Sequence, residues 1–277
     1  MAVLVVDSGV GGLTVLREVR TVMPTQQIIY VGDDAGFPYG GWSEEALVER
    51  LVGLFKHYLS LHDISLAVVA CNTASTLIMP TLRETFDIPF VGTAPAIKPA
   101  AERTQSGLVS VLATPGTLSR RYTKGLIEQF ARDVEMNLVA SSSLAEIAEK
   151  YMQHREIDTD ALWQEIKPCF VQWGGKQTDI VVLGCTHYPF LVNEMRKLAP
   201  WPVDWIDPAE AIAIHALNVL NDTYPSAASD EACNTEVDIA YLTSNRVNSA
   251  AQRLLHGFGL QIQTHGPVKL RALSNSF

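Results

Sequence analysis

The sequence predicts an α/β protein built mainly from parallel sheets, because short apolar strand-like runs alternate with longer helix-like segments. Continuous apolar runs of this length are typical of parallel strands that helices cover on both faces. The chain has 277 residues, and at roughly 100–200 residues per domain this favours two domains. The expected strands are Val3 to Val6, Ile28 to Val31, Ala67 to Val69, Val109 to Leu112 and Ile180 to Leu183.

Between these runs lie segments with helical periodicity, and the alternation of strand and helix indicates α/β architecture. Residues 221–236 and 155–160 are polar and are expected to be connections, and the tail from Gly266 is expected to be loosely ordered. The expected helices are Leu13 to Met23, Ser43 to His62, Thr73 to Phe86, Leu118 to Arg132, Leu144 to His154 and Phe190 to Leu198.

Composition excludes several classes of function. Hydrophobic residues make up 47% of the chain and charged residues 18%, with a formal net charge of −9. An acidic chain without basic runs is a poor candidate for nucleic acid or for an anionic membrane surface. No stretch approaches the ~20 apolar residues of a membrane span. The first apolar run stops at Asp7, too soon for a signal-peptide core, so a cytoplasmic location is expected.

Two cysteines follow apolar strands in similar contexts. One segment reads Cys71-Asn72-Thr73-Ala74-Ser75, and the other reads Gly184-Cys185-Thr186-His187-Tyr188-Pro189. Cys71 is expected near a helix N-terminus, which stabilises a thiolate, and His187 can shift the pKa of Cys185 or donate a proton. For Cys71 the structural alternative is a buried, inert cysteine.

Considered together, the two cysteines leave several interpretations open. A disulfide is disfavoured in a reducing compartment, and the chain has no CxxC pair. One Cys-x-His without a second ligand pair is weak evidence for zinc. A nucleophilic Cys–His pair needs only one cysteine. A matched pair instead suggests two proton-transfer groups on opposite sides of one substrate. Cys169 and Cys233 lack polar motifs and are expected to be structural.

Two further turns follow expected strands. The first is Asp7-Ser8-Gly9-Val10-Gly11-Gly12, where glycines allow close backbone approach to an anion such as a carboxylate. Thr14 stands where a dinucleotide fingerprint needs its third glycine, and a plain strand–helix turn is the alternative. The second turn runs from Asp33 to Gly41, with a simple loop as its alternative.

These segments, in this order, resemble the glutamate racemases of the aspartate/glutamate racemase family. The resemblance covers nearly the whole chain to about Ala213, and the two cysteine motifs are its most specific part. Leu242-Thr243-Ser244 is similar to the family's last strand. The segments that carry it are Asp7 to Leu13, Pro38 to Gly40, Ala70 to Ser75, Pro95 to Pro99, Ala113-Thr114 with Thr117, and Gly184 to Pro189.

The resemblance implies two similar α/β domains with the active site in the cleft between them. The first domain is expected to comprise residues 1–94 plus 208–277, and the second residues 95–207. The implied reaction is interconversion of L- and D-glutamate by two cysteines acting at Cα, without pyridoxal phosphate or another cofactor and without metal. D-glutamate would then supply peptidoglycan synthesis. Glutamate is the expected partner, with no nucleic acid or membrane, and a homodimer is compatible with the sequence.

The resemblance also assigns roles by position. It implies Cys71 and Cys185 as the acid/base catalysts, assisted by Asp7 and His187. The loops departing from the family pattern are Asp34 to Phe37 and Gly41-Trp42, which leave this set intact. The implied substrate-binding residues are Asp7, Ser8, Tyr39, Gly40, Asn72, Thr73, Thr186 and His187, with looser matches at Asp33, Thr117 and Glu149.

Three rival hypotheses remain at this point. The first is another two-cysteine racemase, acting on aspartate or a hydantoin, which a substrate panel would separate. The second is a thiol redox or metal-binding protein, which thiol titration and metal analysis would identify. The third is a binding protein that holds the ligand without turnover.

Overall fold

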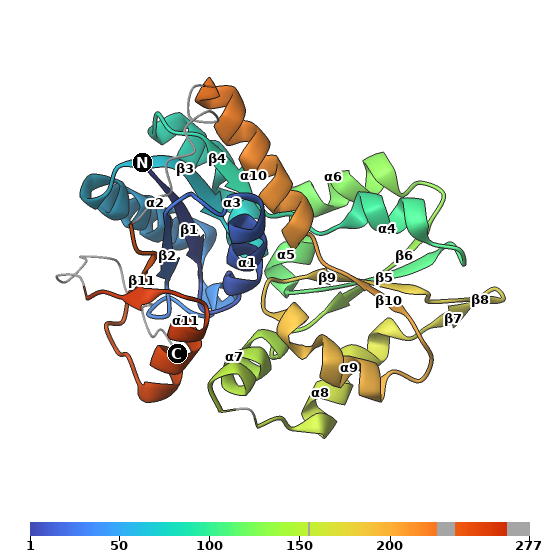
Figure 1. The fold of residues 1–277 in the computed structure, drawn as a ribbon. Coiled ribbons are helices and arrows are strands. Elements are labelled where there is room, and N and C mark those ends of the chain that lie inside the picture. Colours follow the sequence, from blue (N-terminus) through green and yellow to red (C-terminus); the bar gives the residue numbers. More distant parts are fainter. Residues whose placement is uncertain (155, 226–235, 265–277) are drawn as a thin grey trace. The chain divides into compact units, whose positions relative to one another are not determined.

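The computed structural model describes residues 1–154, 156–225 and 236–264 (Figure 1). The chain forms two compact units, Met1–Thr93 with Ala209–Phe277, and Ala94–Pro208. Each unit is built on its own parallel sheet flanked by helices. The predicted fold class is therefore confirmed. Within the described ranges, no helix combines the length and the apolar character that crossing a membrane requires.

The first unit contains a six-stranded parallel sheet with the order β12-β11-β2-β1-β3-β4. Its strands are β1 (Ala2–Asp7), β2 (Ile28–Gly32), β3 (Ile64–Val69), β4 (Phe90–Gly92), β11 (Ile239–Leu242) and β12 (Gln261–Ile262). Its helices are α1 (Leu13–Val22), the 3₁₀ turn η1 (Tyr39–Gly41), α2 (Glu44–Leu61), α3 (Asn72–Thr85), α10 (Ala209–Thr223) and α11 (Ser249–Gly257).

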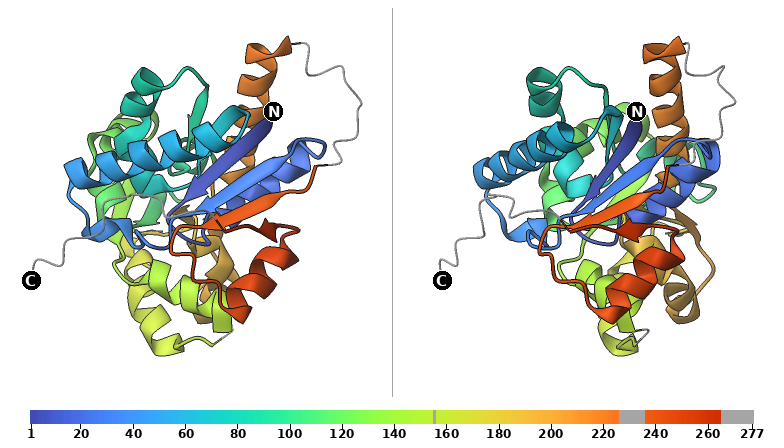
Figure 2. Two further views of the ribbon diagram at one scale, coloured as in Figure 1. Left: turned by 90° about the vertical axis from the view of Figure 1, so that its left-hand side faces the viewer. Right: turned by 60° about the vertical axis from the view of Figure 1, so that its left-hand side comes forward.

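Helices lie on both faces of this sheet (Figure 2). Helices α2 and α3 pack against each other, and α1 packs against α10. Leu4 and Val6 belong to the apolar cluster of the α2–α3 face. Val3 and Val5 are equally buried and point to the opposite face, because successive side chains alternate along a strand. Burial on both sides explains why these strands have uninterrupted apolar sequences.

The second unit contains a four-stranded parallel sheet with the order β10-β9-β5-β6, and a separate antiparallel hairpin. Its strands are β5 (Leu108–Ala113), β6 (Glu135–Ala140), β7 (Gln172–Trp173), β8 (Lys176–Gln177), β9 (Ile180–Gly184) and β10 (Asp204–Ile206). Its helices are α4 (Ile97–Arg103), α5 (Pro115–Ser119), α6 (Arg121–Phe130), α7 (Leu144–His154), α8 (Thr159–Ile166), η2 (Lys167–Cys169), η3 (Tyr188–Leu191) and α9 (Val192–Leu198).

Four strands of the first sheet, β2-β1-β3-β4, repeat the strand order of the second, β6-β5-β9-β10. In the first unit the chain begins at β1, adds β2 on one side, and then crosses to add β3 and β4 on the other. In the second unit it begins at β5, adds β6 on one side, and then crosses to add β9 and β10. The reversal places a topological switch point between β1 and β3 and another between β5 and β9. Ligands of open α/β sheets bind at such points, outside the carboxyl ends of the strands.

Several elements differ from the sequence prediction. The helix expected from Leu118 to Arg132 is two helices, since Arg120 has extended backbone angles between α5 and α6. The connection expected at 155–160 ends early, because the Asp158 side chain caps α8 by accepting from the Asp160 and Ala161 amides. Helix α10 extends to Thr223, into the predicted loop.

Other predictions missed elements or cannot be checked. Strand β6 was missed because it is largely exposed and so lacks an apolar run. The segment predicted as a helix from Phe190 starts as the 3₁₀ turn η3 before α9. Cys233 and the tail from Gly266 lie outside the described residues.

Candidate active site

Cys71 lies at the switch point of the first sheet. It follows the buried strand β3, while Asp7 ends the neighbouring strand β1 and Ser8 comes directly after it. The two strands pair in parallel through Val6 and Val69, so their carboxyl ends meet at one edge. The Ala70 amide donates to the Val6 carbonyl at 2.7 Å, which extends this pairing to the residue before Cys71. Sheet topology therefore brings two motifs together that are far apart in the sequence.

The immediate neighbours of the Cys71 thiol are polar. Its Sγ lies 3.9 Å from Ser8 Oγ, close enough for a weak hydrogen bond to sulfur. Asp7 is 1% exposed, and its Oδ2 accepts a hydrogen bond from the Gly9 amide at 3.0 Å. A Cβ at Gly12 would lie 2.6 Å from the Asp7 Cβ, so glycine is required for the turn to close over this carboxylate. The glycine turn therefore holds Asp7 and Ser8 beside Cys71.

Cys71 is also the N-cap residue of α3, a helix of 14 residues. The free amides and the dipole of a helix N-terminus favour an anion such as a thiolate. The thiol is only 7% exposed, so this backbone field is screened little by water. Thr73 and Asn72 form the first turn of the same helix and are also buried.

Asn72 is the feature of this unit that most directly indicates a ligand. The residue is 2% exposed, and neither its Oδ1 nor its Nδ2 has a hydrogen-bond partner among the described residues. A buried side-chain amide without partners is costly, and such exceptions in folded proteins call for an explanation. A polar substrate bound next to Cys71 would satisfy both atoms.

The loop after β2 adds Asp33 and Tyr39 to this half-site. The Asp33 amide donates to the Asp7 carbonyl at 2.8 Å, and Tyr39 Oη donates to Asp33 Oδ2 at 2.8 Å. Burial raises the pKa of Tyr39, and the nearby charges of Asp33, Cys71 and Asp7 raise it further. The phenol therefore stays protonated near the thiol. Gly40, next in the chain, is exposed.

Cys185 lies at the switch point of the second sheet. It follows strand β9, which pairs in parallel with β5 through Gly184 and Ala113. A Cβ at Gly184 would lie 2.6 Å from the Ala113 Cβ, so a larger residue before Cys185 would force the strand ends apart. Cys185 is 8% exposed. Unlike Cys71, it does not cap a long helix, since the next element is the short 3₁₀ turn η3.

An imidazole and a carboxylate support Cys185. His187 Nδ1 lies 3.8 Å from Cys185 Sγ, and His187 Nε2 lies 3.0 Å from Glu149 Oε1. The side chains of His187 and Glu149 are 2% and 14% exposed, so the pair is largely shielded from water. A carboxylate on one ring nitrogen orients the imidazole and stabilises its protonated form. The His187–Glu149 pair can therefore pass or hold a proton next to the Cys185 thiol.

Thr117 completes the second half-site at the end of β5. It is fully buried in the short helix α5, where its Oγ1 lies 2.9 Å from Thr114 Oγ1. Its carbonyl accepts a hydrogen bond from Thr123 Oγ1 at 2.6 Å, which fixes the turn. Thr186, between Cys185 and His187, is 5% exposed. Each unit thus gathers a thiol, hydroxyl groups and a carboxylate at one strand edge.

The described thiols fall into two kinds. Cys71, Cys169 and Cys185 are not joined in disulfides. Cys169 is fully buried, and burial raises the pKa of its thiol, as expected for a structural cysteine. Over the described ranges, no cluster of three or more His, Cys, Asp or Glu side chains is arranged to hold a metal ion.

Sequence reasoning missed two residues that contact this set. Arg50 of α2 and Thr243 after β11 both bond to Asp33. Arg50 had a detectable signal, since it falls on the apolar face formed by Leu47, Leu51 and Leu54, where an unpaired charge is costly. Thr243 had no such signal, because only the pairing of β11 with β2 brings it near Asp33.

Comparison with known proteins gives a consistent result. Residues 14–216 match the family model described as Asp/Glu/Hydantoin racemase. The chain is 54% identical over 260 residues to the glutamate racemase of Brucella ovis, covering 94% of this chain and 92% of that protein.

Solved structures agree. The Escherichia coli glutamate racemase, in complex with L-glutamate and the activator UDP-MurNAc-ala, has a TM-score of 0.84 and 37% identity, covering 99% of both chains. Glutamate racemase isoform RacE1 of Bacillus anthracis has a TM-score of 0.80 and 27% identity, covering 97% of this chain and 98% of that one. The chain therefore belongs to the Asp/Glu/hydantoin racemase family and is an isomerase of its glutamate racemase group.

Proposed function

We propose that this enzyme interconverts L- and D-glutamate without a cofactor, using Cys71 and Cys185 as the two acid/base groups at Cα. The D-glutamate would serve peptidoglycan synthesis in the cytoplasm. The observation that carries the proposal is the placement of a cysteine outside any disulfide at the switch point of each sheet, each with its own polar neighbours. The 54% identity to the Brucella ovis glutamate racemase supports the choice of substrate.

In this mechanism one cysteine starts as thiolate and the other as thiol. The thiolate removes the Cα proton of the enantiomer that faces it, and the thiol returns a proton to the opposite face. Each turnover exchanges the protonation states of the two cysteines, so the enzyme works in both directions. A reference cysteine has a pKa of ~8.5, so the site must favour the anion. The α3 N-terminus is the feature that would favour the thiolate at Cys71, and the His187–Glu149 pair is placed to take up or return a proton beside Cys185.

The carbanion must be stabilised without the electron sink of a cofactor. Hydrogen-bond donors aimed at the α-carboxylate can do this, and one donor in a dry site is worth roughly 3 kcal/mol. The buried candidates are the Asn72 amide group and the Ser8, Thr73, Thr117 and Thr186 hydroxyls. Each of these side chains is at most 6% exposed, so water competes little for their contacts.

The substrate and the reaction are tested together. The purified enzyme is incubated in D₂O with D-glutamate, L-glutamate, D-aspartate or a hydantoin, without added cofactor. Proton NMR follows loss of the Cα–H signal, and chiral chromatography follows the opposite enantiomer. We expect rapid exchange and racemisation of glutamate alone. Turnover of aspartate or hydantoin in place of glutamate would keep the mechanism and overturn the substrate assignment, and no exchange with any of them would overturn the enzyme proposal.

A second candidate is covalent thiol chemistry, which the Cys185–His187–Glu149 arrangement favours. A thiol, an imidazole and a carboxylate in series are typical of nucleophilic cysteine enzymes. This alternative leaves Cys71 and its matched position without a role. Mass spectrometry of the enzyme quenched during turnover distinguishes the two, since a covalent intermediate adds substrate mass to Cys185 and proton transfer adds none.

A further inference from the structure

The geometry points to Arg50 as a positioning residue that, through Asp33, fixes the Tyr39 loop beside Cys71. No motif of the sequence singled out Arg50. Its predicted kinetic effect rests on the proposed function, whereas its effect on the Cys71 surroundings does not. The loop in question runs from Asp33 to Trp42.

Arg50 and Asp33 form a buried, two-pronged ion pair. Arg50 Nη2 lies 2.5 Å from Asp33 Oδ1, and Arg50 Nε lies 2.6 Å from Asp33 Oδ2. The side chains are 3% and 0% exposed. A buried pair of this geometry fixes both partners, and removal of one partner leaves an uncompensated charge. The pair therefore ties helix α2 rigidly to the loop that follows β2.

Asp33 also holds two other segments in place through hydrogen bonds. Its Oδ2 also accepts from Tyr39 Oη at 2.8 Å, and its Oδ1 accepts from Thr243 Oγ1 at 2.6 Å. The 3₁₀ turn that begins at Tyr39 packs against helix α3, whose N-cap is Cys71. Tyr39 and Cys71 belong to the same apolar cluster. The position of the Tyr39 ring near the thiol is thus set by an ion pair.

The remainder of the loop wraps around the Arg50 guanidinium. Its Cζ lies 5.2 Å from the centre of the Trp42 ring, and Trp42 Nε1 donates to the Gly36 carbonyl at 2.9 Å. A Cβ at Gly36 would lie 2.5 Å from Arg50 Nε and 2.6 Å from Asp33 Oδ2. The ion pair therefore occupies the space that a side chain at position 36 would need, and only glycine fits there. This is a second, independent sign that the loop is built around Arg50.

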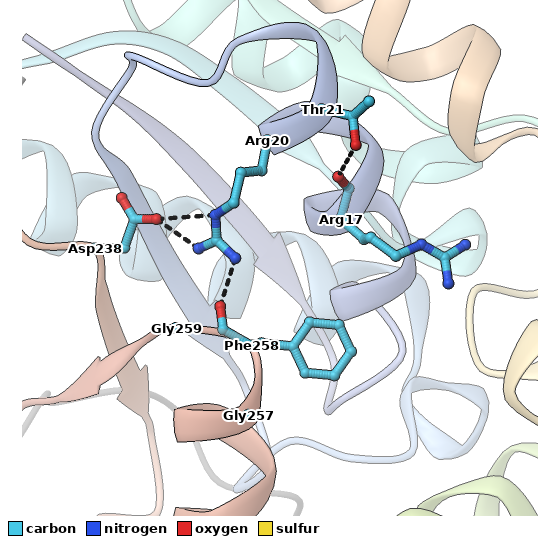
Figure 3. Close-up of a pocket in the computed structure, with 7 residues that line it drawn as sticks. All are labelled: Arg17, Arg20, Thr21, Asp238, Gly257, Phe258 and Gly259. Carbon is cyan, nitrogen blue, oxygen red and sulfur yellow. Dashed lines mark hydrogen bonds and ion pairs between the residues drawn. The ribbon is translucent and has the colours of Figure 1, made fainter. Parts of the chain in front are cut away.

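A purely structural role is the alternative, and the same unit offers a matched control. Arg20 of α1 bonds Asp238 through Nε at 3.1 Å and Nη2 at 2.5 Å, and it also donates to the Phe258 carbonyl (Figure 3). This pair also joins a helix to a distant segment of the first unit, at a shallow pocket lined by Arg17 and Gly259. Arg20→Met removes an Arg–Asp pair that is not part of the Tyr39 loop.

The first test measures access to Cys71 in the full-length enzyme. Five variants are labelled with iodoacetamide at pH 9.5, which is above the reference cysteine pKa of about 8.5, so that access to the thiol limits the labelling rate. The variants are Arg50→Met, Arg50→Lys, Gly36→Ala, Tyr39→Ala and Arg20→Met. Peptide mass spectrometry gives the Cys71 rate relative to the Cys185 rate in the same molecule. Circular dichroism confirms folding, and Arg50→Lys and Gly36→Ala carry the test if Arg50→Met does not fold.

We expect Arg50→Met to raise the Cys71/Cys185 labelling ratio about fivefold or more, because a lost buried pair of this kind frees a loop. Arg50→Lys keeps the charge but loses the two-pronged contact, so its increase should be smaller. Arg20→Met should leave the ratio within twofold. An unchanged ratio in folded Arg50 variants, or an equal rise in Arg20→Met, would overturn the proposal.

The second test asks whether Arg50 acts through Tyr39. Because a binding loop is disturbed while both cysteines remain, Arg50→Met should raise KM for glutamate about tenfold and lower kcat about threefold or less. The double variant Arg50→Met/Tyr39→Ala should match Tyr39→Ala alone, since residues that act in series are not additive. Effects that multiply would overturn the role. A labelling result as expected in a chain that does not racemise glutamate would instead reject the proposed function and keep the positioning of the loop.

Discussion

The Cys71 and Cys185 regions occupy equivalent places in their sheets but support their thiols differently. Cys71 caps a 14-residue helix and has the Ser8 hydroxyl at 3.9 Å. Cys185 precedes only a short 3₁₀ turn and has His187 at 3.8 Å, backed by Glu149. A helix N-terminus and a hydroxyl therefore lie beside one thiol, and an imidazole–carboxylate pair lies beside the other.

Equivalent topology therefore does not impose equivalent chemistry on the two half-sites. The switch point supplies a location, and the residues of the next turn supply the means to stabilise a thiolate. The free energies of L- and D-glutamate are equal, so kcat/KM must be equal in the two directions for any variant. The asymmetry of the two half-sites must therefore appear in kcat and KM taken separately, or in isotope exchange.

The largest effect is expected when either cysteine is removed. Cys71→Ala and Cys185→Ala should each lower kcat/KM for racemisation by about 10³-fold or more, since general acid–base groups contribute about 10²–10⁴-fold. Circular dichroism of the product mixture measures racemisation. Cys169→Ala is the matched control and should retain activity. A cysteine variant that still racemises at above a tenth of the wild-type rate would contradict the two-cysteine account.

A smaller effect is expected for the support of Cys185. His187→Gln should lower kcat/KM by about 10²-fold, at the low end of acid–base contributions. Glu149→Gln keeps a hydrogen-bonding group but loses the charge, so a loss of roughly tenfold is expected. Steady-state kinetics in both directions check this. Equal losses in kcat for both enantiomers would argue against a role confined to one cysteine.

The hydroxyl at Cys71 should matter less. Ser8→Ala removes one neutral hydrogen-bond partner of the thiol, and a net loss of about 3- to 10-fold in kcat/KM is expected. The control is Ser65→Ala, whose buried hydroxyl bonds the Ala2 carbonyl at 3.2 Å at the far end of the sheet strands. A loss as large as that of His187→Gln would show that the two supports are equally important.

The smallest effect on activity is expected at Cys169, the third described thiol. Cys169 is fully buried with a raised pKa, so native iodoacetamide labelling at pH 7.5 should leave it unmodified while Cys71 and Cys185 react. Peptide mass spectrometry reads each cysteine separately. Loss of activity should follow labelling of Cys71 or Cys185. Fast labelling of Cys169 would remove the distinction between structural and catalytic thiols.

Much of this arrangement is predictable from sequence, and the limits have physical causes. The buried strands before Cys71 and Cys185 have continuous apolar sequences, so their carboxyl ends were located within one residue, although β3 starts three residues before the predicted Ala67. Strand β6 lies at an exposed edge and leaves no such pattern. The crossover that puts β3 beside β1 is a property of topology, so nothing local in the sequence reveals that Ser8 lies near Cys71.

The site residues show the same division. The resemblance supplied Asp33 and Glu149 by position, and the structure gives each a partner, in Tyr39 and His187. Arg50 was overlooked because a charged residue in a helix is usually on its solvated face. Only the buried geometry shows that it pairs with Asp33. Their catalytic and binding roles remain predictions.

The most direct test of the two-cysteine mechanism is enantiomer-specific exchange in D₂O by the two alanine variants. We expect Cys71→Ala to exchange the Cα proton of one glutamate enantiomer and Cys185→Ala that of the other, with neither variant producing the mirror image. In each variant the remaining cysteine can remove and return a proton on its own face only. If both variants exchange the same enantiomer, or either still racemises, two cysteines acting on opposite faces cannot be the mechanism.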